Sequence, residues 1–232
     1  MKRFYKQVTL DQRDGGWQVM LDGRAVRTAG KAAQRVPARP LAAALAAEWE
    51  RQGEEIDPAM FVYRDLADYA LDLVTPAPAR AIATILRFAE SDTLCYRGDP
   101  DEALFARQQA VWEPLVVAAE QRWQVHFVRV SGVIHRPQPP ATLARLEAVL
   151  GAADPFTLAA LQTLASLAAS LIVGLAALAP DADGEALWQA AELEEIWQAE
   201  LWGRDAEAKA RQAQRFASFA AAMRFVGLVR TC

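Results

Sequence analysis

Apolar and polar residues alternate along the first part of the chain, as they do in short β-strands. Val8 and Leu10 alternate with polar neighbours, and the same alternation runs from Trp17 to Leu21. Asp14-Gly15-Gly16 separates these runs, and Asp22-Gly23 follows the second. Because Asp-Gly turns between alternating runs are a strong hairpin signal, the pattern predicts a small antiparallel meander within residues 4–37.

The period of the apolar positions then changes to that of a helix. Leu41, Leu45 and Trp49 fall on one stripe, and residues 66–73 show a similar pattern. Thr75-Pro76-Ala77-Pro78 is the clearest linker in the chain. We therefore expect a β-rich N-terminal domain over residues 1–74 and an α-helical C-terminal domain over residues 75–232.

Nearly all of the chain after this linker has a helical pattern, and a short alternation at Val125–Val130 predicts an isolated strand. Asp154-Pro155 and Gly203 are typical helix start and stop signals. The expected fold class is α+β, with a small antiparallel β-rich domain that includes a helix, followed by a mostly α-helical bundle. The predicted helices of the second part cover residues 79–95, 101–123, 140–150, 155–179, 184–202 and 205–228.

The longest stretch without charge, 26 residues between Asp154 and Asp181, is long enough to span a bilayer. Its leucines recur every three or four residues and form one stripe, while the other faces carry mostly Ala, Ser, Thr and Gln. Acidic residues flank the stretch, and neither an aromatic belt nor a basic cluster does. The pattern favours the centre of a helical bundle, and a membrane-associated factor remains the alternative.

Composition narrows the function classes. The chain has 232 residues and a formal net charge of −4, which argues against nucleic-acid binding through a generally basic surface. Residues 1–40 hold nine Lys and Arg against three Asp and Glu, whereas residues 181–210 hold two against nine. Either two solvated surfaces or an acidic face that steers a basic partner explains this asymmetry. Two cysteines, Cys95 and Cys232, and the lack of a secretory signal favour the bacterial cytoplasm.

No motif for catalysis, phosphate binding or metal binding is present. His126 and His135 have no ligand-spaced partner, and Cys95 reads as a buried thiol in an apolar segment. We therefore expect neither a cofactor nor a metal. The alternative is an enzyme of unrecognised type with a helical pocket, which would need two or more of five polar residues to converge: Glu90, Asp92, Arg97, Arg107 and Glu194.

One acidic residue lies in a mostly apolar stripe. On a continuous helix over residues 184–202, Glu194 shares a side with Leu187, Ala191, Gln198 and Leu201. An acid in such a stripe is either paired with a basic residue or exposed in a groove that awaits a partner, and pairing is the more common case.

Several polar and aromatic clusters together resemble one family, the chaperones that assemble the catalytic head of F-type ATP synthase and bind its α subunit. The matching segments run nearly end to end and in the family's order. They are Lys2-Arg3-Phe4-Tyr5-Lys6, Leu21-Asp22-Gly23-Arg24, Glu48-Trp49 with Gln52-Gly53 and Ile56-Asp57-Pro58, Asp92-Thr93-Leu94-Cys95-Tyr96-Arg97, Arg107-Gln108 with Trp112-Glu113-Pro114, and Glu194 to Gln198 with Trp202-Gly203.

The resemblance implies a non-catalytic chaperone, without cofactor or metal, that binds the unassembled ATP synthase α subunit and prevents its aggregation until the α/β hexamer forms. It implies a monomer that neither binds nucleic acid nor inserts into a membrane, in the bacterial cytoplasm and, for eukaryotic relatives, in the mitochondrial matrix. The family's acidic residue corresponds to Glu194, with Glu195 a weaker candidate. The implied partner-binding residues are Glu194, Glu195, Trp197, Gln198 and Trp202.

The sequence departs from the mitochondrial pattern after the Trp202-Gly203 pair. Mitochondrial members have a histidine-containing continuation, whereas Arg204-Asp205-Ala206-Glu207-Ala208 stands here. This difference favours an α-proteobacterial member of the family.

Overall fold

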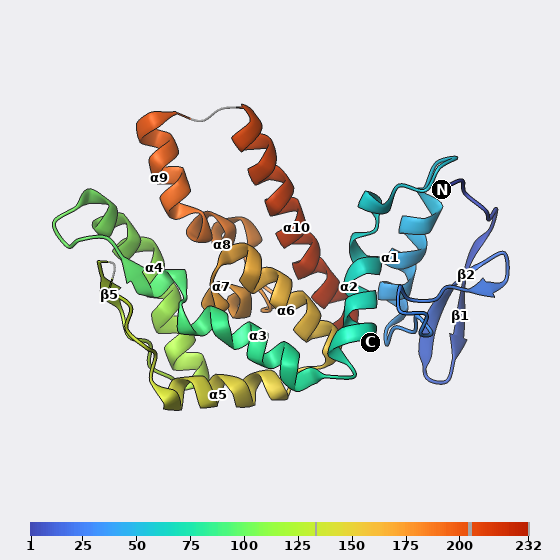
Figure 1. The fold of residues 1–232 in the computed structure, drawn as a ribbon, viewed down its shortest axis with the longest axis horizontal. Helices are drawn as coiled ribbons and strands as arrows, with labels where there is room; N and C mark the ends of the chain where they lie inside the picture. The colour runs from blue at the N-terminus through green and yellow to red at the C-terminus, as the bar shows by residue number, and fades with distance from the viewer. Residues whose placement is uncertain (133, 204–205, 232) are drawn as a thin grey trace. The chain divides into compact units, whose positions relative to one another are not determined.

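In the computed structural model, which describes residues 1–132, 134–203 and 206–231, the N-terminal alternating segments form a three-stranded antiparallel sheet (Figure 1). The strand order is β1 (Val8–Arg13), β2 (Gly16–Leu21) and β3 (Arg24–Ala25), so β2 is central. Both Asp-Gly pairs have positive φ at each residue, 48° and 76° at the first and 46° and 77° at the second. These values suit the tight turns that match the twist of a hairpin, and the predicted meander is confirmed.

Helix α1 (Arg39–Glu50) packs its apolar stripe of Leu41, Leu45 and Trp49 against this sheet. A 3₁₀ turn (Pro58–Met60), helix α2 (Val62–Tyr69) and a π-type turn (Ala70–Val74) follow. The buried carboxylate of Glu48 accepts the backbone N–H groups of Tyr63 and Arg64 at 2.7 and 2.9 Å. Because these N–H groups belong to the first turn of α2, Glu48 fixes the start of that helix against α1.

The rest of the chain is mostly helical, in agreement with the predicted fold class. Two short strands, β4 (Tyr96–Arg97) and β5 (Val130–Ser131), pair in parallel. The helices are α3 (Pro78–Glu90), α4 (Ala103–Trp123), α5 (Pro140–Gly151), α6 (Pro155–Ala168), α7 (Leu171–Ala176), α8 (Gly184–Ala191), α9 (Leu193–Trp202) and α10 (Ala206–Arg230). No helix of the described segments combines the length and the hydropathy that a bilayer crossing requires.

Two predicted segments are shorter than expected. Helix α3 ends at Glu90 instead of residue 95, because Asp92 accepts the N–H of Leu94 and caps a separate 3₁₀ turn over Thr93–Cys95. The strand predicted over residues 125–130 is limited to Val130–Ser131 in β5.

The charge-free stretch is not one helix, as the sequence analysis predicted, but two. Ala169 adopts φ 47°, and Ser170 accepts the N–H of Val173 as the cap of α7. The Ala169 carbonyl accepts the hydroxyl of Thr93 at 2.9 Å, and the buried Asp92 accepts the N–H of Ile172 at 2.9 Å. Polar groups brought in from the Asp92 turn therefore compensate for the break, which no local helical pattern reveals.

The predicted helix over residues 184–202 is also two helices. The chain turns at Glu192, with φ −93° and ψ 16°, so that α8 ends at Ala191 and α9 begins at Leu193. The prediction of one continuous apolar stripe is therefore wrong, because Leu187 lies on α8, whereas Glu194 and Leu201 lie on α9.

Contacts divide the chain into two compact units. Unit 1 comprises residues 1–78, residues 154–160 at the start of α6, and the chain from residue 221 in α10. Unit 2 comprises residues 79–153 and 161–220. In unit 1, the fully buried Phe225 stacks on Tyr63 and lies against Phe156, each at 6.4 Å between ring centroids. The domain boundary near residue 74 stays a prediction, and unit 1 includes chain from well beyond it.

Candidate functional site

Helix α9 carries all five residues that the sequence analysis assigned to partner binding. Its first turn is fixed by Glu192, which is 4% exposed and pairs with Arg215 of α10 at 2.9 Å. Gly203, at φ 82°, ends the helix as predicted. Both ends of the helix are therefore defined by the residues next to them. Arg204 and Asp205, which begin the segment that differs from the mitochondrial pattern, lie outside the described residues.

Glu194 is half-buried and accepts a hydrogen bond from the side chain of Gln108 at 2.7 Å. Gln108 is itself fully buried, and its Oε1 accepts the N–H of Gly98 at 2.9 Å. Within the described residues Glu194 forms no ion pair, so the expectation of a basic partner is wrong. Burial raises the pKa of the Glu194 carboxyl, the neighbouring Glu195 raises it further, and the Gln108 hydrogen bond opposes both.

The partner of the Glu194 carboxylate is thus a neutral amide and not a cation. The Gln108 side chain holds the Glu194 carboxylate in place but leaves its charge uncompensated, at a partly desolvated position. Such a group is available to a cationic or hydrogen-bond-donating side chain of a partner.

The other four residues lie around α9 with different exposure. Trp197 is half-buried, and the Arg107 guanidinium lies over its ring at 5.6 Å. Arg107 also donates to Glu200 at 3.0 Å, and this interaction raises the pKa of the guanidinium. Glu195 and Gln198 are exposed, and Trp202 is 86% exposed, which is far more than a tryptophan with only a packing role requires.

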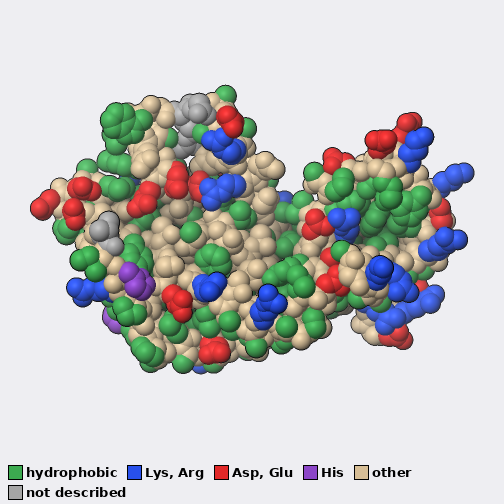
Figure 2. Space-filling view, viewed as in Figure 1, with side chains coloured by type: hydrophobic (Ala, Val, Ile, Leu, Met, Phe, Trp, Pro, Cys, Tyr) green, Lys and Arg blue, Asp and Glu red, His purple; other side chains and the backbone are tan. Residues whose placement is uncertain are grey.

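Two hollows flank α9 within unit 2. A smaller one, of about 410 Å³, has Glu195, Gln198 and Trp202 on one side and Arg211 and Arg215 of α10 on the other. A larger one, of about 870 Å³, is mostly apolar and is bordered by residues of four helices: Arg107, Val111, Trp188, Leu193, Ile196 and Phe216. Figure 2 shows hydrophobic side chains at the C-terminal end of α9, at the upper left of the view, with acidic side chains below them.

The structure thus brings three of the five predicted residues together in one hollow. Glu195, Gln198 and Trp202 share it because they follow each other at spacings of three and four on α9. Glu194 and Trp197 border neither hollow and instead contact Gln108 and Arg107 of α4.

The five residues of the catalytic alternative do not converge. Within the described part of the chain, no hydrogen bond or ion pair joins any two of them, and each has partners outside the set or is exposed. Glu90 is exposed, Asp92 accepts backbone N–H groups, Arg97 pairs with Glu113 at 2.6 Å, Arg107 pairs with Glu200, and Glu194 accepts from Gln108. Asp92 and Arg97, which lie five positions apart, therefore do not pair with each other within the described residues.

Other candidate groups have structural surroundings. Cys95 is buried, and desolvation raises the pKa of its thiol, as expected of a packed side chain rather than of a nucleophile. Cys232 lies outside the described residues. Among the residues that the structure describes, no group of His, Cys, Asp or Glu is placed to hold a metal ion.

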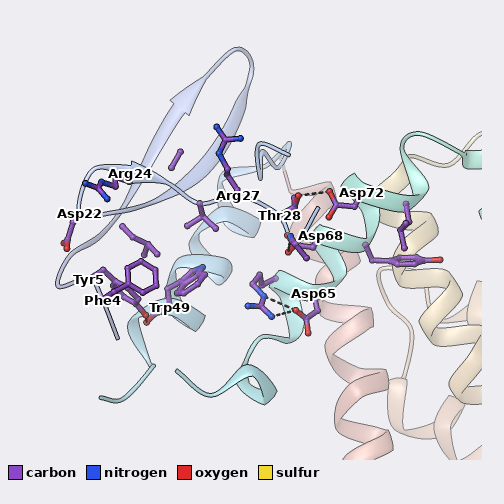
Figure 3. Close-up of a pocket in the computed structure, with 17 residues that line it drawn as sticks. Phe4, Tyr5, Asp22, Arg24, Arg27, Thr28, Trp49, Asp65, Asp68 and Asp72 are labelled. Atoms are coloured by element: carbon purple, nitrogen blue, oxygen red, sulfur yellow. Dashed lines mark hydrogen bonds and ion pairs between the residues drawn. The ribbon is translucent and has the colours of Figure 1, made fainter. Parts of the chain in front are cut away.

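A third concavity, of about 900 Å³, lies within unit 1 and was not predicted from the sequence (Figure 3). It is bordered by residues from Phe4 to Leu73, which come from the sheet, from α1 and from α2. No local pattern could reveal it, because its walls are far apart in sequence. The role of Gln108 was not predicted either, since its position in one of the family segments was the only signal for it.

Exposed aromatic and acidic residues that line open hollows are typical of proteins that bind other proteins. The family comparison specifies this class. Residues 2–120 match the model of the ATP12 chaperone protein family. The chain therefore belongs to the ATP12 chaperone family, and the resemblance drawn from the sequence is confirmed.

Solved structures agree with this assignment. Atp12 from Paracoccus denitrificans is 38% identical, over 99% of this chain and 98% of that one, with a TM-score of 0.92. The structure of an Asp-to-Lys mutant of the same protein matches equally well. A candidate chaperone from Agrobacterium tumefaciens is also 38% identical, over 99% of this chain and 86% of that one, with a TM-score of 0.93.

Proposed function

We propose that this chaperone binds the unassembled α subunit of ATP synthase, prevents its aggregation and releases it as the α/β catalytic hexamer forms. We further propose that it acts without catalysis, as a monomer in the bacterial cytoplasm. The observation that carries the proposal is the surface of α9. There a half-buried carboxylate, which has no ion pair within the described residues, lies on the same helix as side chains that line two open hollows.

The side chains around α9 suit the reversible binding of an unassembled subunit. An unpaired subunit exposes interface area that drives aggregation. The larger hollow offers Trp188, Ile196 and Phe216 to such an apolar surface, and Trp202 extends from the helix end. Because the surrounding charges of Glu195, Arg211 and Arg215 remain in water, the binding would be moderate and reversible. A native partner subunit could then displace the chaperone without nucleotide hydrolysis.

The test uses purified full-length protein and isolated α subunit, whose aggregation is followed by light scattering. The wild-type chain should suppress aggregation near equimolar ratio without nucleotide. Glu194→Lys should fold normally but lose this effect, because an ammonium group would replace the acceptor of Gln108 and invert the charge. Glu194→Gln should keep the hydrogen bond to Gln108 and lose only the charge, so its activity should fall between the two.

A matched control separates charge from position. Glu147→Lys makes the same change at an exposed position of α5 in unit 2, and it should suppress aggregation like the wild type. If Glu194→Lys unfolds, the proposed role of Glu194 in binding is wrong. If the wild-type chain has no effect on the scattering and does not co-purify with α, the proposed client is wrong.

A further inference from the structure

The concavity of unit 1 is a groove between an edge segment of the sheet and a helix. Residues 24–29 form one wall. The other wall is one face of α2 and the turn after it, formed by Arg64, Asp65, Asp68, Tyr69, Asp72 and Leu73. Figure 3 shows the segment with Arg24, Arg27 and Thr28 opposite the helix with Asp65, Asp68 and Asp72. None of these residues belongs to α9.

Hydrogen bonds between the walls close one end of this groove. Asp72 accepts the hydroxyl of Thr28 and the N–H of Gly30, both at 2.7 Å. Asp68 accepts the N–H of Ala29 at 3.0 Å. The separation of the walls is therefore set by the chain itself, so an occupant would meet a preformed groove.

The wall at residues 24–29 has an open backbone edge. The Val26 N–H donates to the Val19 carbonyl at 2.9 Å, and Ala25 pairs with Met20. Because neighbouring residues of an antiparallel strand turn their backbone groups to opposite sides, the N–H and C=O of Ala25 point away from β2.

The backbone groups of Arg27, two residues further along the segment, are also unpaired within the described residues. The Thr28 N–H donates to Ala32, and the Val26 carbonyl accepts the N–H of Gln34. Between them, the backbone N–H and C=O of Arg27 make no hydrogen bond within the part of the chain that the structure describes. Ala25 and Arg27 both line the groove and so offer an alternate-residue template to an added strand.

The floor and rims of the groove are apolar and aromatic. Tyr5 and Trp49 line it, with their rings 5.5 Å apart in an edge-to-face arrangement. Trp49 is 7% exposed, and its indole N–H has no hydrogen-bond partner in the described chain. Phe4 and Leu73, which also line the groove, are 63% and 60% exposed. Exposed apolar side chains around a concave aromatic floor are typical of a protein-binding site.

The cations that have no carboxylate partner within the described residues lie on the wall at residues 24–29, the edge wall of the groove. On the helix wall, Asp65 pairs with Arg64 at 2.6 Å, and Asp68 and Asp72 already accept hydrogen bonds from the opposite wall. Arg24 and Arg27 form no ion pair within the described residues. An acidic side chain on the occupant would complement them.

We propose that this groove binds an extended segment of the client protein by strand addition. The segment pairs with the backbone of Ala25 and Arg27, places an apolar or aromatic side chain over Tyr5 and Trp49, and carries an acidic residue that faces Arg24 or Arg27. The inference rests on the proposed function, since an unassembled subunit exposes segments that become ordered only in the complex.

The first experiment uses overlapping short peptides that cover the ATP synthase α and β subunits as probes of the full-length chaperone. Peptides that combine an acidic residue with an aromatic or aliphatic one should bind. The paired substitution Arg24→Glu with Arg27→Glu should weaken this binding by at least about tenfold. A paired substitution of two arginines outside the groove, Arg80→Glu with Arg87→Glu on α3, should leave it unchanged.

A backbone test distinguishes strand addition from side-chain contact alone. Ala25→Pro removes the outward N–H but leaves the bonds of Arg24 and Val26 to β2, so it should abolish peptide binding in a protein that still folds. Ala25→Val keeps that N–H and should bind as the wild type does. In hydrogen exchange, the amides of Ala25 and Arg27 should become protected when a binding peptide or the intact α subunit is added.

The outcomes separate this inference from the proposed function. If no peptide binds, or if Arg24→Glu with Arg27→Glu and Ala25→Pro bind as the wild type does, the groove is not a strand-addition site. If these variants still suppress α-subunit aggregation fully and the amides stay unprotected, the inference fails while the proposed function stands. If peptides bind in the groove but aggregation of α is never suppressed, the assignment of the α subunit as client is wrong, whereas the groove is still a strand-addition site. Self-association through this edge instead of peptide binding would also overturn the inference.

Discussion

At the scale of single residues, the structure distinguishes acids that stabilise the fold from an acid that remains available. Asp92 is fully buried and accepts two backbone N–H groups, whereas Glu194 is half-buried and accepts one amide hydrogen bond. The sequence indicated that Glu194 is unusual, because it lies among apolar neighbours. It could not identify Gln108 as its partner, because 86 positions separate them and either a cation or an amide fits the local pattern.

Asp92 should make stability depend on pH. Burial raises the pKa of this carboxyl to about 6 in the folded chain, from 3.8 for the free group, against the opposing effect of its hydrogen bonds. The folded state therefore takes up a proton more readily than the unfolded state. The contribution of Asp92 to folding is most favourable below about pH 4 and is lost as the pH rises to about 6.

Asp92→Asn should remove this component. The urea midpoint of the wild type, compared between about pH 4 and about pH 6, should show a pH-dependent loss of stability that the variant lacks. Asp101→Asn makes the same change at an exposed position and should keep the wild-type trend. An unchanged trend in Asp92→Asn would show that other groups cause it.

Trp202 should matter for binding and not for folding. Because it is 86% exposed, Trp202→Ala should change the free energy of unfolding by no more than about 0.5 kcal/mol. If the residue contacts the client, the affinity for isolated α subunit should fall by about tenfold or more. Leu201→Ala, at a 59% exposed position that does not border the smaller hollow, is the control. Equal effects of both substitutions on affinity would contradict a specific role for Trp202.

At the scale of elements, the boundaries that the sequence predicts well are those with local chemical causes. The Asp-Gly hairpins, the Asp154 cap of α6 and the Gly203 end of α9 each depend on one or two neighbouring residues. The breaks at Ala169 and Glu192 were missed because groups from elsewhere in the chain stabilise them: Thr93 and Asp92 at the first, Arg215 at the second. Helical periodicity continues across both breaks and so conceals them.

Close packing of α7 on α6 gives an element-scale prediction. A Cβ atom added at Gly174 would lie 3.1 Å from Leu161 Cδ1 and 3.2 Å from the backbone nitrogen of Ala165. Gly174→Ala should therefore destabilise the fold by about 1–3 kcal/mol, because overpacking outweighs the better helix propensity of alanine.

Gly227→Ala is the matched control for this prediction. A Cβ atom at Gly227 in α10 meets nothing within 4 Å, so this substitution should stabilise the chain by about 0.5–1 kcal/mol. Chemical denaturation of both variants measures the change in the free energy of unfolding, which should be negative for Gly174→Ala and positive for Gly227→Ala. Stabilisation by Gly174→Ala would show that α6 and α7 do not approach each other so closely.

At the scale of the whole molecule, the α+β class follows from the change in apolar period near residue 40, and the sequence predicted it. The composition of unit 1 could not be predicted, because the start of α6 and the end of α10 join it from distant parts of the chain. The Thr75-Pro76-Ala77-Pro78 linker signals a local break in the chain. It carries no information about which later segments pack beside the segments that precede it.

A fragment of residues 1–78 should consequently be less stable than the same region in the full chain. It would lack Phe156 and Phe225, which pack in unit 1, and would expose the aromatic face around Tyr63. Chemical denaturation, followed in both chains by the amide hydrogen exchange of residues 1–78, should show an earlier or less cooperative transition in the fragment. Equal midpoints would support an autonomous domain that ends near residue 74.

By the proposed function, this ATP12-family chaperone binds an unassembled α subunit and releases it to a native partner subunit. Size-exclusion chromatography with light-scattering mass determination, on the full-length chain mixed with isolated α subunit before and after addition of β subunit, tests it most directly. A one-to-one complex with α should form and should disappear when β is added, while α moves into an α/β assembly and the chaperone elutes free. The absence of a complex with α, or a complex that β cannot displace, would contradict it.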